Sequence, residues 1–118
     1  MTVRNAVGEF WLWARGRRRR LRVEGESMVP TVQPGQYVLY EPDATPAVGD
    51  VVVARHPSQS IDIVKRVGAI DSVGLVELTS DNGSVGTDSR TFGRIEVGDV
   101  LGRVTISLEW PFAEVGRR

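Results

Sequence analysis

Ser27 and Lys65 are the two side chains of this 118-residue sequence whose types and surroundings could support covalent chemistry. Ser27 stands between Gly25 and a turn limited by Pro30, where a hydroxyl can be exposed beside backbone N–H groups able to bind an oxyanion. Lys65 is the single lysine among 15 basic residues, so only this residue and the α-amine can supply a neutral amine near neutral pH. Such an amine could take the serine proton, as in other Ser-Lys pairs.

The segment around Lys65 predicts an apolar environment for its amine. Alternate residues of a strand share a face, so Lys65 would point to the same side as Ile63 and Val67. That face would desolvate the ammonium and lower its pKa. His56, the single histidine, lies in a context typical of a surface turn and is a poor candidate for the base. On these residues alone, a turn serine and a strand-edge lysine are the simpler interpretation.

The composition excludes several kinds of chemistry. The sequence has no cysteine, which excludes disulfides, thiolate metal sites and thiol nucleophiles. A single histidine excludes a multi-histidine metal cluster, so we expect neither a metal nor another cofactor. The apolar run at residues 10–14 is far shorter than the roughly 20 residues of a membrane-spanning helix. These features predict one soluble domain of ordinary size.

The elements that would position Ser27 and Lys65 are mainly short strands. Residues 3–15 carry apolar side chains at helical spacing and predict a short helix. Glycine and proline turns then separate short apolar runs, which predict strands. The expected strands lie at residues 21–23, 36–40, 51–55, 62–67, 75–78 and 100–108. We therefore expect an N-terminal basic arm over residues 1–22 and a single mainly β domain of short antiparallel strands over residues 23–118.

Four sequence blocks resemble those of the bacterial type I signal peptidase family, in that family's order and near its spacing. They cover about residues 23–104. The blocks are Gly25-x-Ser27-Met28-x-Pro30-Thr31, Gly49-Asp50-Val51-Val52, Val64-Lys65-Arg66-Val67, and Asp81-Asn82 followed by Asp88-Ser89-Arg90 and Gly93. The resemblance implies a β catalytic core, a Ser-Lys dyad and endopeptidase cleavage of an N-terminal leader.

The resemblance also implies a role for each matching residue. Ser27 would be the nucleophile and Lys65 the general base. Gly25, Met28 and Pro30 would belong to the oxyanion and substrate-binding region, with Met28 lining it. The residues expected to support the active site are Arg66, Asp81, Asn82, Asp88, Ser89 and Arg90.

Within this supporting set, Arg66 lies on the strand face opposite Lys65 and could form an ion pair with Asp81 or Asp88. The chain departs from the family at Gly86, where a serine or asparagine is usual. A hydrogen bond to the lysine would then be absent, or supplied by Ser84, Thr87 or water. Typical members also begin with transmembrane helices, which this sequence does not show.

A short member of this kind is similar to nickel-type superoxide dismutase maturation proteases, whose substrate is a cytosolic precursor with a leader. The expected partner is therefore the leader of a precursor protein. Three alternatives remain open: general signal-peptidase-like processing of a membrane-associated substrate, a self-cleaving repressor-type protein, and a non-enzymatic binding module. We expect the protein in the cytoplasm, either free or peripheral at the inner face of the membrane.

The basic arm could bind a second partner. Residues 1–22 contain seven arginines against one acidic residue, Glu9, a net charge of 7 − 1 = +6. Trp11 and Trp13 beside these arginines favour weak contact with an anionic membrane surface over nucleic acid. A solvated basic segment is the simpler interpretation.

Overall fold

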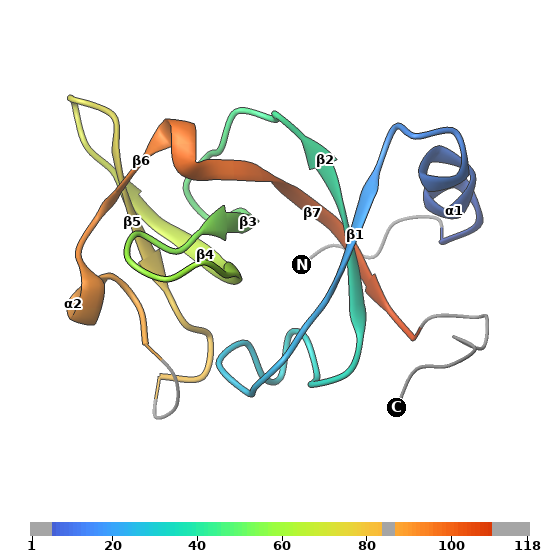
Figure 1. Ribbon diagram of the computed structural model, residues 1–118, viewed down its shortest axis with the longest axis horizontal. Helices are drawn as coiled ribbons and strands as arrows, with labels where there is room; N and C mark the ends of the chain where they lie inside the picture. Colours follow the sequence, from blue (N-terminus) through green and yellow to red (C-terminus); the bar gives the residue numbers. More distant parts are fainter. Residues whose placement is uncertain (1–5, 84–86, 110–118) are drawn as a thin grey trace.

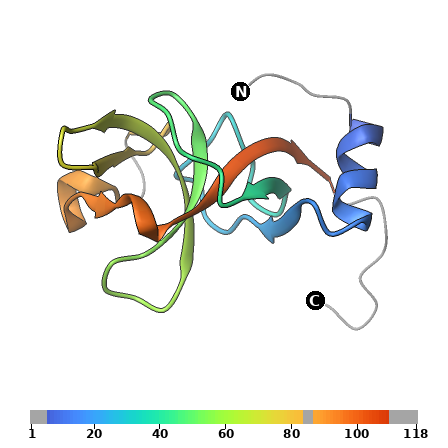
Figure 2. The same cartoon turned by 90° about the horizontal axis from the view of Figure 1, so that it is seen from above.

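The chain forms one curved sheet of seven antiparallel strands, in the order β1-β2-β7-β3-β4-β5-β6. The computed structural model describes residues 6–83 and 87–109. Its elements are α1 (Ala6–Ala14), β1 (Arg19–Arg22), β2 (Tyr37–Pro42), β3 (Val51–Arg55), β4 (Asp62–Ile70), β5 (Leu75–Thr79), α2 (Ser89–Phe92), β6 (Ile95–Glu96), a 3₁₀ turn (Val97–Asp99) and β7 (Val100–Leu108). The sheet wraps into a half-barrel with α1 at one end (Figures 1 and 2), which confirms the mainly β fold.

The long strand β7 joins the two halves of the sheet (Figure 1). It pairs with β2 on one edge and with β3 on the other. Both ladders shift register, between Leu39 and Tyr40 in β2 and between Val53 and Ala54 in β3. Such bulges bend and twist strands, so they give the sheet the curvature that closes it around its core.

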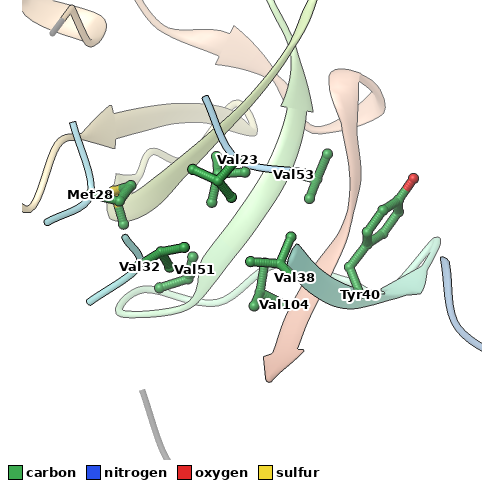
Figure 3. Close-up of a cluster of buried hydrophobic side chains, with 9 residues drawn as sticks. Val23, Met28, Val32, Val38, Tyr40, Val51, Val53 and Val104 are labelled. Atoms are coloured by element: carbon green, nitrogen blue, oxygen red, sulfur yellow. The ribbon is translucent and has the colours of Figure 1, made fainter. Parts of the chain in front are cut away.

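Two hydrophobic clusters fill the two faces of the central strands. The first contains Val23, Met28, Val32, Val38, Tyr40, Val51, Val53, Val64 and Val104 (Figure 3). The second contains Val52, Ala54, Val67, Val76, Leu78, Ile95 and Val100. Alternate residues of β3 enter alternate clusters, so this strand is buried on both faces and its unbroken apolar sequence is explained.

The expected strands at residues 51–55 and 100–108 match β3 and β7. Other expected strands differ in extent from the observed ones. The strand expected at residues 21–23 is β1 (Arg19–Arg22), an edge strand where the basic side chains remain exposed. The strand expected to end at Val67 continues to Ile70, because a bulge between Val67 and Ala69 lets it pass Gly68 without leaving the sheet. Residues 3–5 of the expected helix lie outside the described residues.

Helix α1 is fixed to the sheet through Glu9. This side chain is buried, accepts a hydrogen bond from the Thr105 hydroxyl of β7, and forms an ion pair of 3.1 Å with Arg18. The ion pair compensates the charge of Glu9, which would be costly to bury alone. No helix among the described residues has the length and apolar character needed to cross a membrane.

Candidate active site

Ser27 and Lys65 line the same pocket, a cavity of about 320 Å³. One wall is formed by residues 21–24 and Ser27, and the other by residues 61–65. The first wall follows β1, which pairs only with β2 among the described strands. The second is the start of β4, which pairs with β3 on one edge but meets β5 only from Arg66 onward. The pocket therefore lies between two strand edges that no described strand covers.

The loop from β1 to β2 carries Ser27. Gly25 adopts φ +75°, a conformation that other residues rarely accept, and so turns the chain toward Ser27. Met28 and Val32 then anchor the loop in the first cluster, and the Val32 N–H donates to the Met28 carbonyl at 2.9 Å. Among the described residues, the N–H groups of Ser27 and Met28 donate to no protein acceptor. Ser27 lines the pocket, so its N–H is available to an oxyanion, whereas Met28 is buried.

Asp81 and Asn82 hold the Ser27 loop against the strand that carries the lysine. The Asn82 N–H donates to the Ser27 carbonyl at 2.8 Å, and its side-chain amide donates to the Glu26 carbonyl at 3.2 Å. Asp81 accepts a hydrogen bond from the Thr31 hydroxyl of the same loop. The motif acts as a clamp that contacts the loop at three points.

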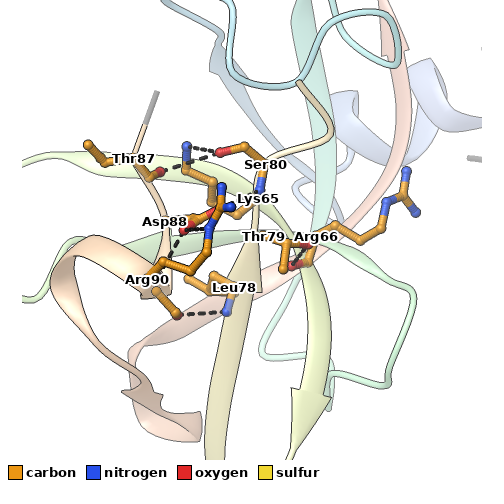
Figure 4. A network of polar contacts seen from close by, with 9 residues as sticks. Lys65, Arg66, Leu78, Thr79, Ser80, Thr87, Asp88 and Arg90 are labelled. Atoms are coloured by element: carbon orange, nitrogen blue, oxygen red, sulfur yellow. Dashed lines mark hydrogen bonds and ion pairs between the residues drawn. The ribbon is translucent and has the colours of Figure 1, made fainter. Parts of the chain in front are cut away.

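Arg66 completes this clamp from β4. Its Nε and Nη2 atoms donate to the two carboxylate oxygens of Asp81, each at 2.8 Å, and its Nη1 donates to the Gly49 carbonyl at 2.7 Å. The expected ion pair is thus formed with Asp81 and not with Asp88. Hydrogen bonds from Arg66 and Thr31 lower the pKa of the Asp81 carboxyl. Arg66 points away from Lys65 (Figure 4), as the alternation of the strand predicts.

The Lys65 side chain is buried, with 4% of the residue exposed. Its Nζ donates a hydrogen bond of 3.1 Å to Ser80 Oγ (Figure 4). The Ser80 hydroxyl in turn donates to the Thr87 carbonyl at 3.4 Å, so a lone pair of Ser80 faces the amine. Among the described contacts, Lys65 makes no hydrogen bond to Ser27. Burial lowers the pKa of the Lys65 ammonium.

Asp88 is the carboxylate that opposes the effect of burial on the pKa of Lys65. It is buried, and its negative charge raises the pKa of Lys65, although burial is the larger influence. The Arg90 guanidinium, hydrogen-bonded to Asp88 at 3.1 Å, holds the pKa of that carboxyl below its usual range. Asp88 also accepts from the Ser80 N–H at 3.3 Å and caps α2 by accepting from the Arg90 N–H at 3.0 Å. The carboxylate therefore stays charged and fixes Ser80.

Ser89 supports the site indirectly. Its hydroxyl accepts a hydrogen bond of 2.8 Å from the Leu78 N–H, which ties α2 to the end of β5 (Figure 4). Asp88, Ser89 and Arg90 thus form one structural unit behind the lysine, with Asp88 as the member that acts on Lys65 electrostatically.

Three residues of the expected substrate region do not line this pocket. Met28 is 1% exposed and packs in the first cluster, and neither it, Gly25 nor Pro30 belongs to the pocket lining. His56, expected in a surface turn, is buried. Its Nδ1 accepts from the N–H groups of Ser58 and Gln59, each at 3.1 Å, and its ring lies 4.8 Å from that of Phe92. This contact joins residues distant in the sequence, so the local polar context of His56 was misleading.

Ser80 is the site residue that sequence reasoning missed. The sequence predicts Ser84, Thr87 or water in place of the side chain absent at Gly86, but residues 84–86 lie outside the described part of the chain. Thr87 contributes its carbonyl to Ser80. Among the described residues, no group of three or more histidine, cysteine, aspartate or glutamate side chains is arranged to hold a metal ion.

Comparison with known proteins identifies the family of the chain. Residues 5–105 match the model of the Peptidase S24-like family. The mouse (Mus musculus) mitochondrial inner membrane protease subunit 1 is 31% identical over an alignment of 116 positions, which covers 78% of this chain and 69% of that protein. The resemblance carried by the four sequence blocks is thereby confirmed at the level of this family. The chain belongs to the Peptidase S24-like family.

Proposed function

We propose that the protein is a serine endopeptidase that uses Ser27 and Lys65 as a catalytic dyad to remove a leader peptide from a precursor. The observation that carries this proposal is that a serine and a buried lysine line one pocket. Membership of a peptidase family supports the reaction class. The name of the mouse relative, a protease, supports it further.

The substrate would bind as an extended strand. The pocket walls are the outer edge of β1 and the first residues of β4, and in the part of the chain that the structure describes neither has a neighbouring strand on that edge. An extended peptide placed between such edges gains main-chain hydrogen bonds. Its side chains would meet the apolar lining of Leu21, Val23 and Ile63.

In the proposed reaction, the neutral Lys65 amine takes the proton of Ser27 Oγ as that oxygen attacks the scissile carbonyl carbon. The N–H group of Ser27 stabilises the oxyanion. The C–N bond then breaks, and the leaving amine takes the proton back from the Lys65 ammonium. A water molecule, deprotonated by Lys65, attacks the acyl carbonyl carbon, and the C–O bond to Ser27 breaks as Oγ takes the proton back from Lys65.

Ser80 would act as a positioning residue for Lys65. It accepts from Nζ while its own proton is committed to the Thr87 carbonyl, so the amine is held in one orientation. The hydrogen bond to Ser27 would form when substrate is bound, since catalytic hydrogen bonds often tighten only in the complex.

For the substrate, we propose the precursor of a nickel-type superoxide dismutase, processed in the cytoplasm or at the inner face of the membrane. The similarity of the sequence to maturation proteases of that enzyme supports this choice. The test incubates the protein with this precursor and, separately, with a secretory precursor, followed by intact-mass measurement.

A single new mass equal to the leader-free dismutase would support both reaction and substrate. Cleavage of the secretory precursor alone would reject the dismutase as substrate and leave the endopeptidase in place. Loss of mass from the protease itself, with neither precursor cleaved, would instead indicate self-cleavage.

A further inference from the structure

Helix α1 presents an apolar stripe to solvent. Val7 is 66% exposed and Trp11 is 58% exposed. They stand four residues apart, and Arg15 follows four residues later, so the three lie along one side of the helix and its C-terminal turn. A tryptophan with this exposure costs free energy in water and is typical of a surface that meets a partner.

Only some of the basic residues next to this stripe form ion pairs with described carboxylates. Between Phe10 and Val23 the sequence contains six arginines and no acidic residue. Among these arginines, Arg18 is paired with Glu9 at 3.1 Å and Arg22 lies 3.7 Å from Glu24.

Arg20 lies over the rings of Trp13 and Tyr37, at 5.5 and 5.2 Å from their centroids. Arg15 and Arg17 are exposed, and no carboxylate of the described residues forms an ion pair with either. The guanidinium groups of Arg15, which follows Trp11 at helical spacing, and of Arg17 therefore remain available for an anionic partner.

We propose that Val7, Trp11, Arg15 and Arg17, here called the arm face, dock the protein on an anionic lipid bilayer. Tryptophan is favoured at the headgroup level, and arginine is attracted by the negative surface potential of anionic lipids. A nucleic acid would use the arginines but offers no apolar region for Val7. The lipid surface accommodates both parts of the arm face.

The arm face and the pocket are linked by a short stretch of chain. The chain runs from α1 directly into β1, and Leu21 and Arg22 at its end line the pocket that contains Ser27. The arm face contains no residue of that pocket, so membrane docking stands independently of the proposed proteolysis.

The test measures co-sedimentation of the full chain with vesicles of phosphatidylcholine alone or mixed with phosphatidylglycerol, at low and at physiological salt. We expect binding to the mixed vesicles only, weakened by salt. Arg15→Gln and Arg17→Gln should each lower the partition coefficient roughly fivefold. Trp11→Ser should also weaken binding, whereas Arg55→Gln, which removes an exposed arginine of β3 outside the arm face, should leave it unchanged.

Three results would overturn the proposal: no sedimentation with the mixed vesicles, equal binding to both kinds of vesicle, or equal effects of Arg55→Gln and the arm-face variants. Tighter binding to duplex DNA than to the mixed vesicles, with no effect of Trp11→Ser, would assign the arm face to nucleic acid instead. Cleavage of a soluble leader peptide is measured in parallel. Its failure would reject the proteolytic function without affecting the vesicle result.

Discussion

Lys65 Nζ donates a hydrogen bond of 3.1 Å to Ser80 Oγ, at the point where β5 ends opposite β4. The two strands pair Arg66 with Thr79, so the next position along the same register brings Lys65 beside Ser80. Ser80 is further fixed by its hydrogen bonds to Thr87 and Asp88. The orientation of the buried amine thus depends on the register of two strands.

Replacing Ser80 should therefore impair catalysis more than folding. We expect Ser80→Ala to lower kcat by roughly 10- to 100-fold, since a hydrogen bond to a charged group contributes about 1.5–3 kcal/mol. The variant removes an acceptor that stabilises the Lys65 ammonium, so the acidic limb of the pH–rate profile should move to lower pH. Ser80→Thr, which keeps the hydroxyl, should restore most of the rate.

Ser72 is an exposed serine in the turn at the other end of the same hairpin. Ser72→Ala is therefore the matched control and should change neither kcat nor the pH–rate profile. A Ser80→Ala enzyme with reduced stability but an unchanged pH profile would show that Ser80 is only structural.

The pH dependence of activity tests the electrostatics around Lys65. Because burial lowers the pKa of this group, kcat/KM should rise with pH through a midpoint below the roughly 10.4 of an exposed lysine. Asp88 raises the pKa of Lys65, so Asp88→Asn should move the midpoint to lower pH. A midpoint that moves to higher pH in Asp88→Asn would contradict this assignment.

The Arg66–Asp81 pair should stabilise the fold and the Ser27 loop together. A double-mutant cycle with Arg66→Met and Asp81→Asn, measured by urea unfolding, should give a coupling energy of about 1–3 kcal/mol. Each single variant should also slow cleavage, because Asp81 contacts the loop through Thr31. Full stability and full activity in Arg66→Met would reject the clamp.

The Arg66–Asp81 pair also predicts how the unfolding free energy decreases at acid pH. The pKa of Asp81 is lowered in the folded state, so its contribution to stability is complete above its unfolded pKa of about 3.9 and is lost as the pH falls through the folded value. Asp81→Asn should therefore flatten the decrease in unfolding free energy below pH ~4.

A substitution at Gly102 tests the packing of β7 against β2. A Cβ atom built there would lie 2.3 Å from the Glu41 carbonyl oxygen and 2.6 Å from Tyr40 Cδ2. The backbone of β2 cannot move away without breaking its hydrogen bonds to β7. Gly102→Ala should therefore lower the unfolding free energy by about 2 kcal/mol or more. Gly98→Ala, where no atom lies within 4 Å of the added Cβ, should change it by less than about 0.5 kcal/mol. Equal effects of the two changes would contradict the strand pairing.

Much of the fold could be predicted from local patterns. The apolar run of β3 and the glycine that precedes it determine a strand regardless of context, and its residue range was predicted correctly. The alternation of β4 also placed Lys65 and Arg66 on opposite faces. The range of β1 was predicted less well, because edge strands tolerate polar sequences such as that of β1.

The partner of Lys65 could not be predicted in the same way. Near the turn of the β4–β5 hairpin, Ile70 pairs with Val76, and this register continued along the strands would place Asp81 opposite Lys65. The bulge at Gly68 shifts the register by one residue and brings Ser80 there instead. A glycine within a strand is compatible with a bulge but does not specify one, so the sequence contained only a weak signal.

The most direct test of the dyad compares kcat/KM for leader cleavage by the wild type, Ser27→Ala and Lys65→Met, with folding checked by thermal unfolding. The dyad predicts that each folded variant loses activity by roughly 10⁴-fold or more, and that the double variant is no worse than either single one. Cleavage by folded Ser27→Ala or Lys65→Met at a rate close to that of the wild type would contradict the proposed mechanism.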